Sequence, residues 1–181
     1  MARRAKKNYV NNRDLLDALI KYQSDCRDAE EAGEELKPRV PDYIGTCIFQ
    51  IASRLSTKPN FSGYTYRDDM VSDGVENCLL YIGNFKPEKS ANPFAYFTQI
   101  IWYAFLRRIA KEKKQMYIRF KSSQQMIASG GTYEGDDVSL NLYNNADYMN
   151  TFVQDFEDKI ERDKAKKKEV LDEAADDKDE E

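Results

Sequence analysis

The residues in this sequence with the clearest chemical meaning are a group of aromatic side chains followed by a run of cations. Six aromatic residues lie between Phe94 and Phe105, and the segment from Arg107 to Lys121 holds seven basic residues and one acidic residue. An aromatic ring that stacks on a nucleic-acid base contributes roughly 1 to 3 kcal/mol, and Lys and Arg neutralise phosphates. The two features together indicate binding to nucleic acid whose bases are exposed, as in a single strand or an opened duplex.

The side-chain inventory argues against an enzyme. The chain has no histidine, which is the commonest general base and a frequent metal ligand. Its three cysteines, Cys26, Cys47 and Cys78, show neither metal-ligand spacing nor a disulfide framework, and we interpret them as reduced core residues. The eight glycines form no phosphate-binding loop. We therefore predict a protein without catalytic activity that needs no cofactor and no metal.

The charge of the chain is segregated along its length. The 181 residues carry a formal net charge of −4, but residues 154–181 alone hold 13 acidic and 7 basic residues, so the rest of the chain is net positive. This asymmetry predicts a polyanion-binding body with an acidic tail. No segment has the length and apolar character of a membrane span or a signal peptide, so we expect no membrane contact.

Apolar residues recur at helical spacing in several segments, and no segment alternates with the period of a strand, so we predict an all-α fold. A basic arm is expected at residues 1–7, and the charged stretch from Asp25 to Lys37 is expected to be a helix end and a loop. Helices are expected from Asn11 or Asn12, over 41–55, over about 66–83 and 93–114, and from about 147. The expected organisation is a compact domain of about four helices at 1–125, a flexible linker at 126–146, and a C-terminal helix with its acidic tail at 147–181.

The helix that begins at Pro93 has more rings than one core face needs. At 100° per residue, the residues that share a face with Phe94 and suit the core are Phe97, Ile101, Ala104, Phe105 and Ile109. The opposite side carries Tyr96, Gln99, Tyr103 and Arg107, with Trp102 at the border. Such a stripe is also typical of a contact between helices, and cations are common at a helix C-terminus. A nucleic-acid platform and a protein interface therefore both remain open.

Part of the sequence also resembles a known protein family. The segment DMVSDGVENCLLYIGNFKPEKSANPFAYFTQIIWYAFLRRI, residues 69–109, resembles conserved region 2 of bacterial sigma factors. In that family a helix that opens D-L-I-Q-E-G is followed by a turn with a Phe and then by an aromatic-rich helix with a basic end. The residues that match in type or identity are Asp69, Met70, Val71, Asp73 and Gly74 in the opening, and Phe85 in the turn.

Further motifs are similar to the late-transcription sigma factors of T-even-like phages. The stretches YVNN, IGTCIFQIASRLS, NFSGYT, NPFAYFTQ and TFVQDFEDKI occur in the same order as in that group, over about residues 8–160. The resemblance implies a phage-encoded subunit that binds the RNA polymerase core of the host bacterium, in the cytoplasm of the infected cell. The subunit would direct transcription initiation at late promoters through an A/T-rich −10-like element. The alternative is a helical module that binds single-stranded nucleic acid without any polymerase.

The resemblance also assigns roles to individual residues. Those implied to dock on the coiled coil of the largest polymerase subunits are Asp69, Ser72, Asp73, Glu76 and Leu79. Those implied to capture opened non-template bases are Phe94, Tyr96, Phe97, Gln99, Trp102 and Tyr103, of which Phe97 also falls on the expected core face. Those implied to hold phosphates are Arg107, Arg108, Lys111, Lys113 and Lys114.

The sequence departs from the sigma pattern in three places. The stretch QIIW stands where primary sigma factors carry two adjacent tryptophans, so the resemblance does not imply that this protein opens promoters unaided. Few residues follow Ser123, too few for a helix-turn-helix that reads a −35 element; the phage group instead docks a C-terminal segment on the polymerase flap. The residues implied for flap docking are Tyr148, Phe152, Val153, Phe156 and Ile160, although this stripe could also pack within its own domain. A motif for the sliding clamp is not matched at the C-terminus, and SLNLY at 139–143 is only faintly similar.

Overall fold

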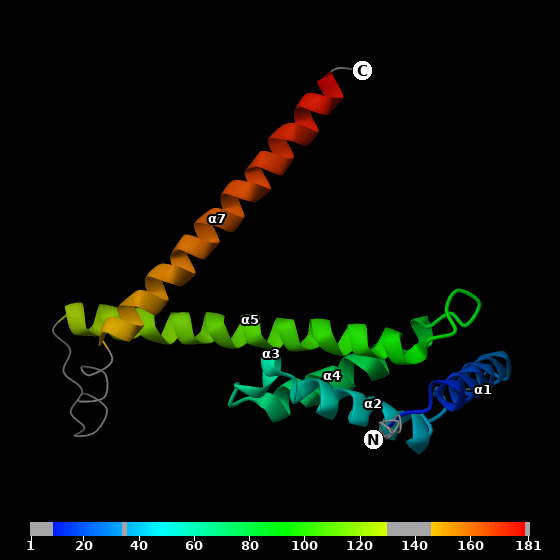
Figure 1. Cartoon of the computed structure of the whole chain (residues 1–181). Coiled ribbons are helices and arrows are strands. Elements are labelled where there is room, and N and C mark those ends of the chain that lie inside the picture. Colours follow the sequence, from blue (N-terminus) through cyan, green and yellow to red (C-terminus); the bar gives the residue numbers. More distant parts are fainter. Residues whose placement is uncertain (1–8, 34–35, 130–145, 180–181) are drawn as a thin grey trace, which may run out of the picture. The chain divides into compact units, whose positions relative to one another are not determined.

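The computed structural model describes residues 9–33, 36–129 and 146–179, with side chains to residue 169 in the last segment. Within these ranges the regular structure is helical, which confirms the all-α prediction. The elements are α1 (Asn12–Glu31), α2 (Asp42–Ser56), α3 (Pro59–Ser62), α4 (Arg67–Tyr81), the 3₁₀ helix η1 (Ile82–Asn84), α5 (Pro93–Ala128) and α7 (Ala146–Asp179) (Figure 1). None of the described helices is both long enough and apolar enough to cross a bilayer. The expected arm at 1–7 and most of the expected linker lie outside the described residues.

The chain divides into two compact units, residues 1–110 and 111–181, and the division falls inside α5. The sequence predicts a boundary at about residue 125, where the turn-forming residues begin. Unit 1 holds α1 to α4, η1 and the first half of α5, and unit 2 holds the second half of α5 and α7.

Helix α1 begins where the sequence predicts it, at an asparagine cap. The Asn11 side chain accepts a hydrogen bond from the backbone N–H of Arg13 at 3.1 Å and donates one to Asp14 at 2.8 Å. A cap of this kind satisfies backbone N–H groups that lack a partner in the first turn. Helix α1 ends at Glu31, within the stretch from Asp25 to Lys37 where a helix end was expected, and it buries Ala29.

Helix α2 lies at the centre of unit 1. Its apolar stripe is buried, as its three- and four-residue spacing predicts, and consists of Ile44, Cys47, Ile48, Ile51, Ala52 and Leu55. Residues of α1, α4 and α5 complete the same core. The break that the sequence predicts after Ser56 is present, but Pro59 begins the short helix α3, whose Phe61 is fully buried.

Helices α4 and α5 approach each other closely at Gly74 of α4. A Cβ atom at this position would lie 3.1 Å from Ile101 Cγ2 and 3.1 Å from Phe105 Cε1, both on α5. The two α5 side chains are themselves fully buried, so they have little room to yield. The absence of a side chain at Gly74 therefore lets α4 and α5 pack face to face.

Helix α5 is longer than predicted. It was expected to end near Lys114 but continues to Ala128. No glycine or proline interrupts residues 94–128, and the first glycine after them is at position 130, so nothing in the sequence breaks the helix earlier. Tyr117 and Phe120 in the added turns pack against α7, which supplies tertiary support.

The core of unit 2 is a small aromatic contact between α5 and α7. Tyr117 stacks on Phe156 with ring centroids 4.6 Å apart, and Phe120 meets Phe152 edge to face at 5.5 Å. Beside these rings in the same contact, Glu157 accepts a hydrogen bond from the Tyr117 hydroxyl at 2.8 Å and pairs with Lys121 Nζ at 2.9 Å. The hydrogen bonds from Lys121 and Tyr117 lower the pKa of Glu157 from its ordinary value of 4.5.

We predict that Gly74→Ala destabilises the protein by about 1 to 2 kcal/mol, because overpacking at a rigid contact outweighs the higher helix propensity of alanine. Gly45→Ala is the matched control: Gly45 also lies within a helix, and its added Cβ would meet no atom within 4 Å. That control should stabilise the protein by about 0.5 to 1 kcal/mol. Urea unfolding measures both, and equal stabilisation by the two substitutions would show that the close approach is absent.

We also predict a pH dependence for the contact in unit 2. The pKa of Glu157 is lower in the folded state, so its stabilisation is present above the ordinary value of 4.5 and is lost as pH falls through the folded-state pKa. Glu157→Gln should therefore lower the thermal melting temperature at pH 6, and the difference from the native protein should shrink as the pH falls below 4.5. Circular dichroism at 222 nm measures both, and a difference that stays constant over this range would contradict the pairing.

Candidate nucleic-acid interface

The first half of α5 separates its side chains into a core face and an exposed face. Phe97, Ile101, Ala104 and Phe105 are buried, which confirms the core face that helical spacing predicts. The exposed face carries Ala95, Gln99, Tyr103 and Arg107 at four-residue spacing. Tyr103 retains 52% of its surface exposed, so its ring is available to a partner.

Between these two faces, α5 lines an open cleft with α2 and α3. The cleft has a volume of about 770 Å³, and its walls include Arg54, Lys58, Asn60, Phe94, Thr98 and Trp102, with Tyr9 from the segment before α1. A shallower hollow of about 390 Å³ shares Phe94, Thr98 and Trp102 and extends to Gln99 and Tyr103. The two hollows form one surface that runs from Tyr9 to Tyr103.

The rings of this cleft are held in place by other rings. Trp102 meets buried Phe61 edge to face with centroids 4.8 Å apart, and Phe94 meets Tyr9 in the same way at 5.8 Å. Each ring is therefore fixed on one side by packing, while the cleft leaves another side open. Fixed rings lose little conformational entropy when a planar ligand stacks on them.

Cations lie beside the rings. The Arg54 guanidinium lies 4.4 Å from the centroid of the Tyr9 ring, a cation–π distance. Burial raises the pKa of the Tyr9 hydroxyl, and the charge of Arg54 lowers it by less. Tyr9 is therefore a neutral ring at physiological pH, and Arg54 and Lys58 supply positive charge at the cleft wall. Such a surface can stack a base and neutralise its phosphate, but it holds no acid–base pair.

Two of the rings implied for base capture are engaged in packing. Phe97 is fully buried in the core, so its assignment as a base-contacting residue is wrong for this structure. Tyr96 is only partly exposed and packs on Phe85 and Phe97. Its hydroxyl donates a hydrogen bond to the carbonyl of Tyr81 at 2.7 Å, which satisfies an acceptor in the last turn of α4. Helical spacing predicted Tyr96 to be a spare ring on the face opposite the core, but in the structure it holds α4 to α5.

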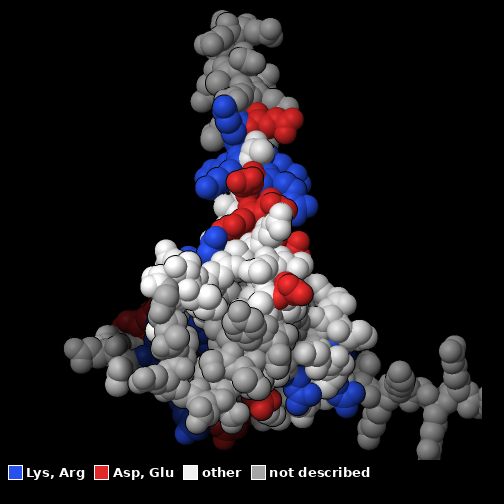
Figure 2. Space-filling model, turned by 90° about the vertical axis from the view of Figure 1, so that its left-hand side faces the viewer, with Lys and Arg blue, Asp and Glu red and all other residues white. Residues whose placement is uncertain are grey.

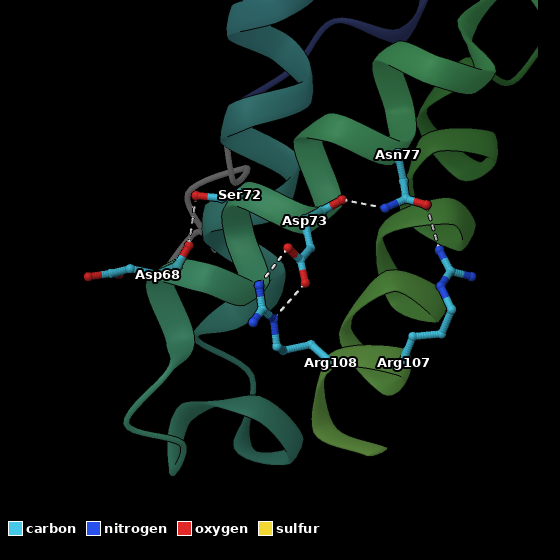
Figure 3. Close-up of polar contacts among 6 residues, drawn as sticks. All are labelled: Asp68, Ser72, Asp73, Asn77, Arg107 and Arg108. Carbon is cyan, nitrogen blue, oxygen red and sulfur yellow. Dashed lines mark hydrogen bonds and ion pairs between the residues drawn. The ribbon is translucent and has the colours of Figure 1, made fainter. Parts of the chain in front are cut away.

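Two of the arginines implied for phosphate binding contact α4 (Figure 3). Arg108 makes a bidentate ion pair with Asp73, with Nε to Oδ2 at 2.6 Å and Nη2 to Oδ1 at 2.8 Å. The side chains are only 18% and 29% exposed, so the pair is shielded from solvent. Arg107 donates to Asn77 Oδ1 at 2.6 Å but remains exposed, with further N–H groups directed to solvent.

This pairing changes the assignment of Asp73 and Arg108. Each satisfies the other with two charge-assisted hydrogen bonds, which are among the stronger polar contacts in proteins. Asp73 is thus not a free carboxylate for a docking partner, and Arg108 is not a free cation for phosphate. In the structure these residues join α4 to α5, which neither assignment anticipated.

The remaining residues implied for polymerase docking lie on an open face of α4. Asp69, Ser72, Glu76 and Leu79 are exposed and fall on one side of the helix at steps of three and four. The Ser72 hydroxyl donates to the carbonyl of Asp68 at 3.1 Å, which leaves its side chain against its own helix (Figure 3). Asp69 and Glu76 form no ion pair with a described cation, so they present unneutralised charge.

In unit 2, the three lysines implied for phosphate binding are exposed: Lys111, Lys113 and Lys114. The stripe implied for flap docking is largely occupied by packing against α5. Val153 is buried, and Phe152 and Phe156 are half-buried by rings of α5. Ile160 remains exposed. Packing within the unit, which the sequence left open, is therefore what the structure shows for most of this stripe.

Sequence reasoning missed three residues of the cleft: Tyr9, Arg54 and Lys58. Tyr9 follows the expected basic arm, and Arg54 lies beside the apolar stripe of α2, so neither position stands out by periodicity. Tyr9 opens the stretch YVNN of the phage resemblance, Arg54 lies within IGTCIFQIASRLS, and Lys58 lies just before NFSGYT, and this was the available signal. The candidate clamp motif at 139–143 lies outside the described residues.

Comparison with known proteins finds neither a protein-family model nor a curated protein that matches this sequence. Among the described residues, no group of three His, Cys, Asp or Glu side chains is placed to hold a metal ion.

We predict that the Asp73–Arg108 pair contributes a coupling energy of about 1 to 3 kcal/mol to folding, because both side chains are shielded and the geometry is bidentate. A double-mutant cycle with Asp73→Asn and Arg108→Gln, followed by urea unfolding, measures this energy. The control is the cycle for Arg39 and Asp42, an ion pair whose side chains are 90% and 91% exposed. That pair should couple by less than about 0.5 kcal/mol, and similar values for both cycles would refute the structural role.

Proposed function

We propose that this protein is a sigma-like transcription initiation factor of the phage late type. It would bind a bacterial RNA polymerase core and hold the opened non-template strand of an A/T-rich −10-like promoter element. The sequence resemblance suggests this role, and the proposal depends on it for the identity of the polymerase. No chemical step is assigned to the protein itself.

The observation that carries the proposal is the cleft between Tyr9 and Tyr103. Core packing leaves this surface unfilled although it is lined by rings, with Arg54 and Lys58 at its wall. In a duplex the faces of the bases are covered by stacking, so the rings of this cleft cannot stack on the bases of closed DNA. Bases that leave the stack expose faces that can lie on Trp102 or Tyr103, with roughly 1 to 3 kcal/mol for each stacked base.

The revised set of DNA-contacting residues follows from exposure. In unit 1 it comprises Tyr9, Arg54, Lys58, Phe94, Gln99, Trp102, Tyr103 and Arg107. In unit 2, Lys111, Lys113 and Lys114 are exposed cations that suit phosphates. Phe97, Tyr96 and Arg108 are left out because packing or ion pairing already occupies them.

The exposed face of α4 is the proposed polymerase-docking surface. Its carboxylates, Asp69 and Glu76, carry charge that suits a basic partner, and Leu79 adds an exposed apolar side chain. An interface with a small apolar centre and charged surroundings is typical of a specific protein contact. Asp73 supports this face indirectly, because its pair with Arg108 fixes the orientation of α4 on α5.

The test is reconstitution with bacterial core RNA polymerase on an A/T-rich −10-like template, supplied as a closed duplex and as a pre-opened bubble. We predict that Tyr103→Ala reduces open-complex formation about tenfold, which corresponds to the loss of one stacked base, and leaves core binding within about twofold. Double substitution of Asp69 and Glu76 by Lys should reverse this pattern and weaken core binding at least tenfold. Permanganate footprinting and fluorescence anisotropy measure the two steps.

The matched control is Phe49→Ala, since Phe49 is a ring of similar exposure, 56%, on the outer face of α2. It should change neither step. Failure of the native protein to bind any bacterial core polymerase, together with tight binding to single-stranded DNA alone, would reject the sigma role in favour of a general single-strand-binding module.

A further inference from the structure

Beyond its contact with α5, α7 carries a group of lysines that no packing explains. After Glu157, every described residue of α7 is exposed, and residues 162–168 hold five basic residues and one acidic residue. Figure 2 shows these cations gathered on α7, with carboxylates among them. From residue 161 to residue 169 the segment contains no large apolar side chain, so a second helix has nothing to pack against.

The positions of these lysines continue the face of α7 that contacts α5. Along that face, steps of three and four residues lead from Met149, Val153, Phe156 and Ile160 to Lys164, Lys167 and Lys168. The first members of this series pack in unit 2, whereas all three lysines are exposed. Two carboxylates, Asp163 and Glu161, flank these three lysines on the same side of α7. The stripe therefore changes from apolar to net cationic where the ring contacts with α5 end.

The partner face of α5 changes in the same way. Tyr117 and Gln124 contact α7, the latter by a hydrogen bond to Asn150 at 2.6 Å. Because Gln124 meets Asn150 and Tyr117 meets Glu157, the two helices run antiparallel. The next turn of α5 toward its N-terminus places Lys113 and Lys114 on the same side as Tyr117, within about 60° of it. Both are exposed.

Two helix faces that meet through rings at one end thus carry like charges at the other. The second half of α5 and α7 form a helical hairpin. Lysines on its two facing helices repel each other, so bringing these ends together would not stabilise the hairpin. None of these five lysines forms an ion pair with a described carboxylate. An anion between the two helices would neutralise both sets at once.

We propose that the open end of the α5–α7 hairpin in unit 2 is a two-sided site for the phosphate backbone of duplex DNA. One side is formed by Lys113 and Lys114, and the other by Lys164, Lys167 and Lys168. It extends the DNA contact of the proposed function from α5 to α7, and it does not require polymerase.

Duplex DNA is the ligand that this chemistry fits. Neither side of the site carries a ring, so bases have nothing to stack on, in contrast to the cleft of unit 1. Lysine ammonium groups bind phosphates as point charges and do not read sequence. A membrane surface is disfavoured because the segment has no apolar face to insert among lipids. A duplex presents about one charge per 1.7 Å of its axis, so five lysines on two short helix segments meet several phosphates.

The test measures binding of the full chain to a fluorescent 20-base-pair duplex without a −10-like element, by anisotropy between 50 and 200 mM salt. The slope of log K against log salt is negative, and its magnitude falls by about 0.9 for each phosphate contact removed. We predict that the triple variant Lys164→Gln, Lys167→Gln, Lys168→Gln reduces this slope by about 2 to 3, and that Lys113→Gln with Lys114→Gln reduces it by about 1 to 2. Circular dichroism confirms that each variant remains helical.

The matched control removes three cations from the opposite face of the same helix: Lys159→Gln, Arg162→Gln and Lys166→Gln. This face also carries Asp155, Asp158 and Glu169, so its cations are already offset, and the slope should change by less than 1. Equal effects of the two triple variants would mean a general charge effect and would overturn the site. So would the absence of duplex binding at 50 mM salt, or equally strong, lysine-dependent binding to phosphatidylserine vesicles.

The same assay separates this site from the proposed function. Tyr103→Ala should leave the slope for duplex DNA unchanged, because Tyr103 belongs to the cleft that receives bases. A protein that fails in transcription but keeps the lysine-dependent slope would disprove the sigma role and leave the duplex site standing. A protein that supports transcription without any change in slope in the triple variant would disprove the duplex site alone.

Discussion

The contact of α4 with α5 at Gly74 is the constraint on which the rest of unit 1 depends. With Ile101 and Phe105 pressed against a residue that has no side chain, α5 can turn only one face to the core. That orientation buries Phe97 and directs Tyr103 to solvent. It also places Trp102 and Phe94 at the border, where they line the cleft. The exposed aromatic surface is thus a consequence of tight packing on the other side of the helix.

Polar contacts then lock the same pair of helices. Arg108 holds Asp73, Arg107 reaches Asn77, and the Tyr96 hydroxyl binds the carbonyl of Tyr81. A shielded ion pair adds little net stability compared with an apolar contact of equal size, but it strongly disfavours any arrangement in which one partner is left alone. The polar and aromatic residues of α4 and the first half of α5 are therefore of two kinds: those that join α4 to α5, and those that remain exposed.

In unit 2, the face of α7 that contacts α5 changes along the helix from apolar residues to lysines. Rings and the Tyr117–Glu157–Lys121 cluster hold α7 to α5, and lysines replace them one to two turns further. The contact is small, so the association of these helices depends on few residues. This design leaves cationic surface available on both helices where a closed hairpin would bury it.

The sequence by itself determined the helical class, the positions of α2 and α4, the cap of α1 and the core face of α5. Each of these depends on spacing along one helix, which a single segment already carries. It also led to the proposal of nucleic-acid binding, because rings beside cations are visible in the sequence itself. It missed the length of α5 and the short helix α3, which depend on contacts with distant residues such as Phe156 and Trp102.

Only the tertiary structure decided which polar and aromatic residues are free. Asp73 and Arg108 are 35 positions apart in the sequence, and both appear as surface charges when each helix is considered alone. Tyr9 and Arg54 appear unrelated until folding brings them to one side of Trp102. Helical periodicity describes the direction of a side chain from its own helix axis and contains no information on what lies opposite. That information arises only when the helices pack, and it separates the residues that hold this protein together from those that stay exposed.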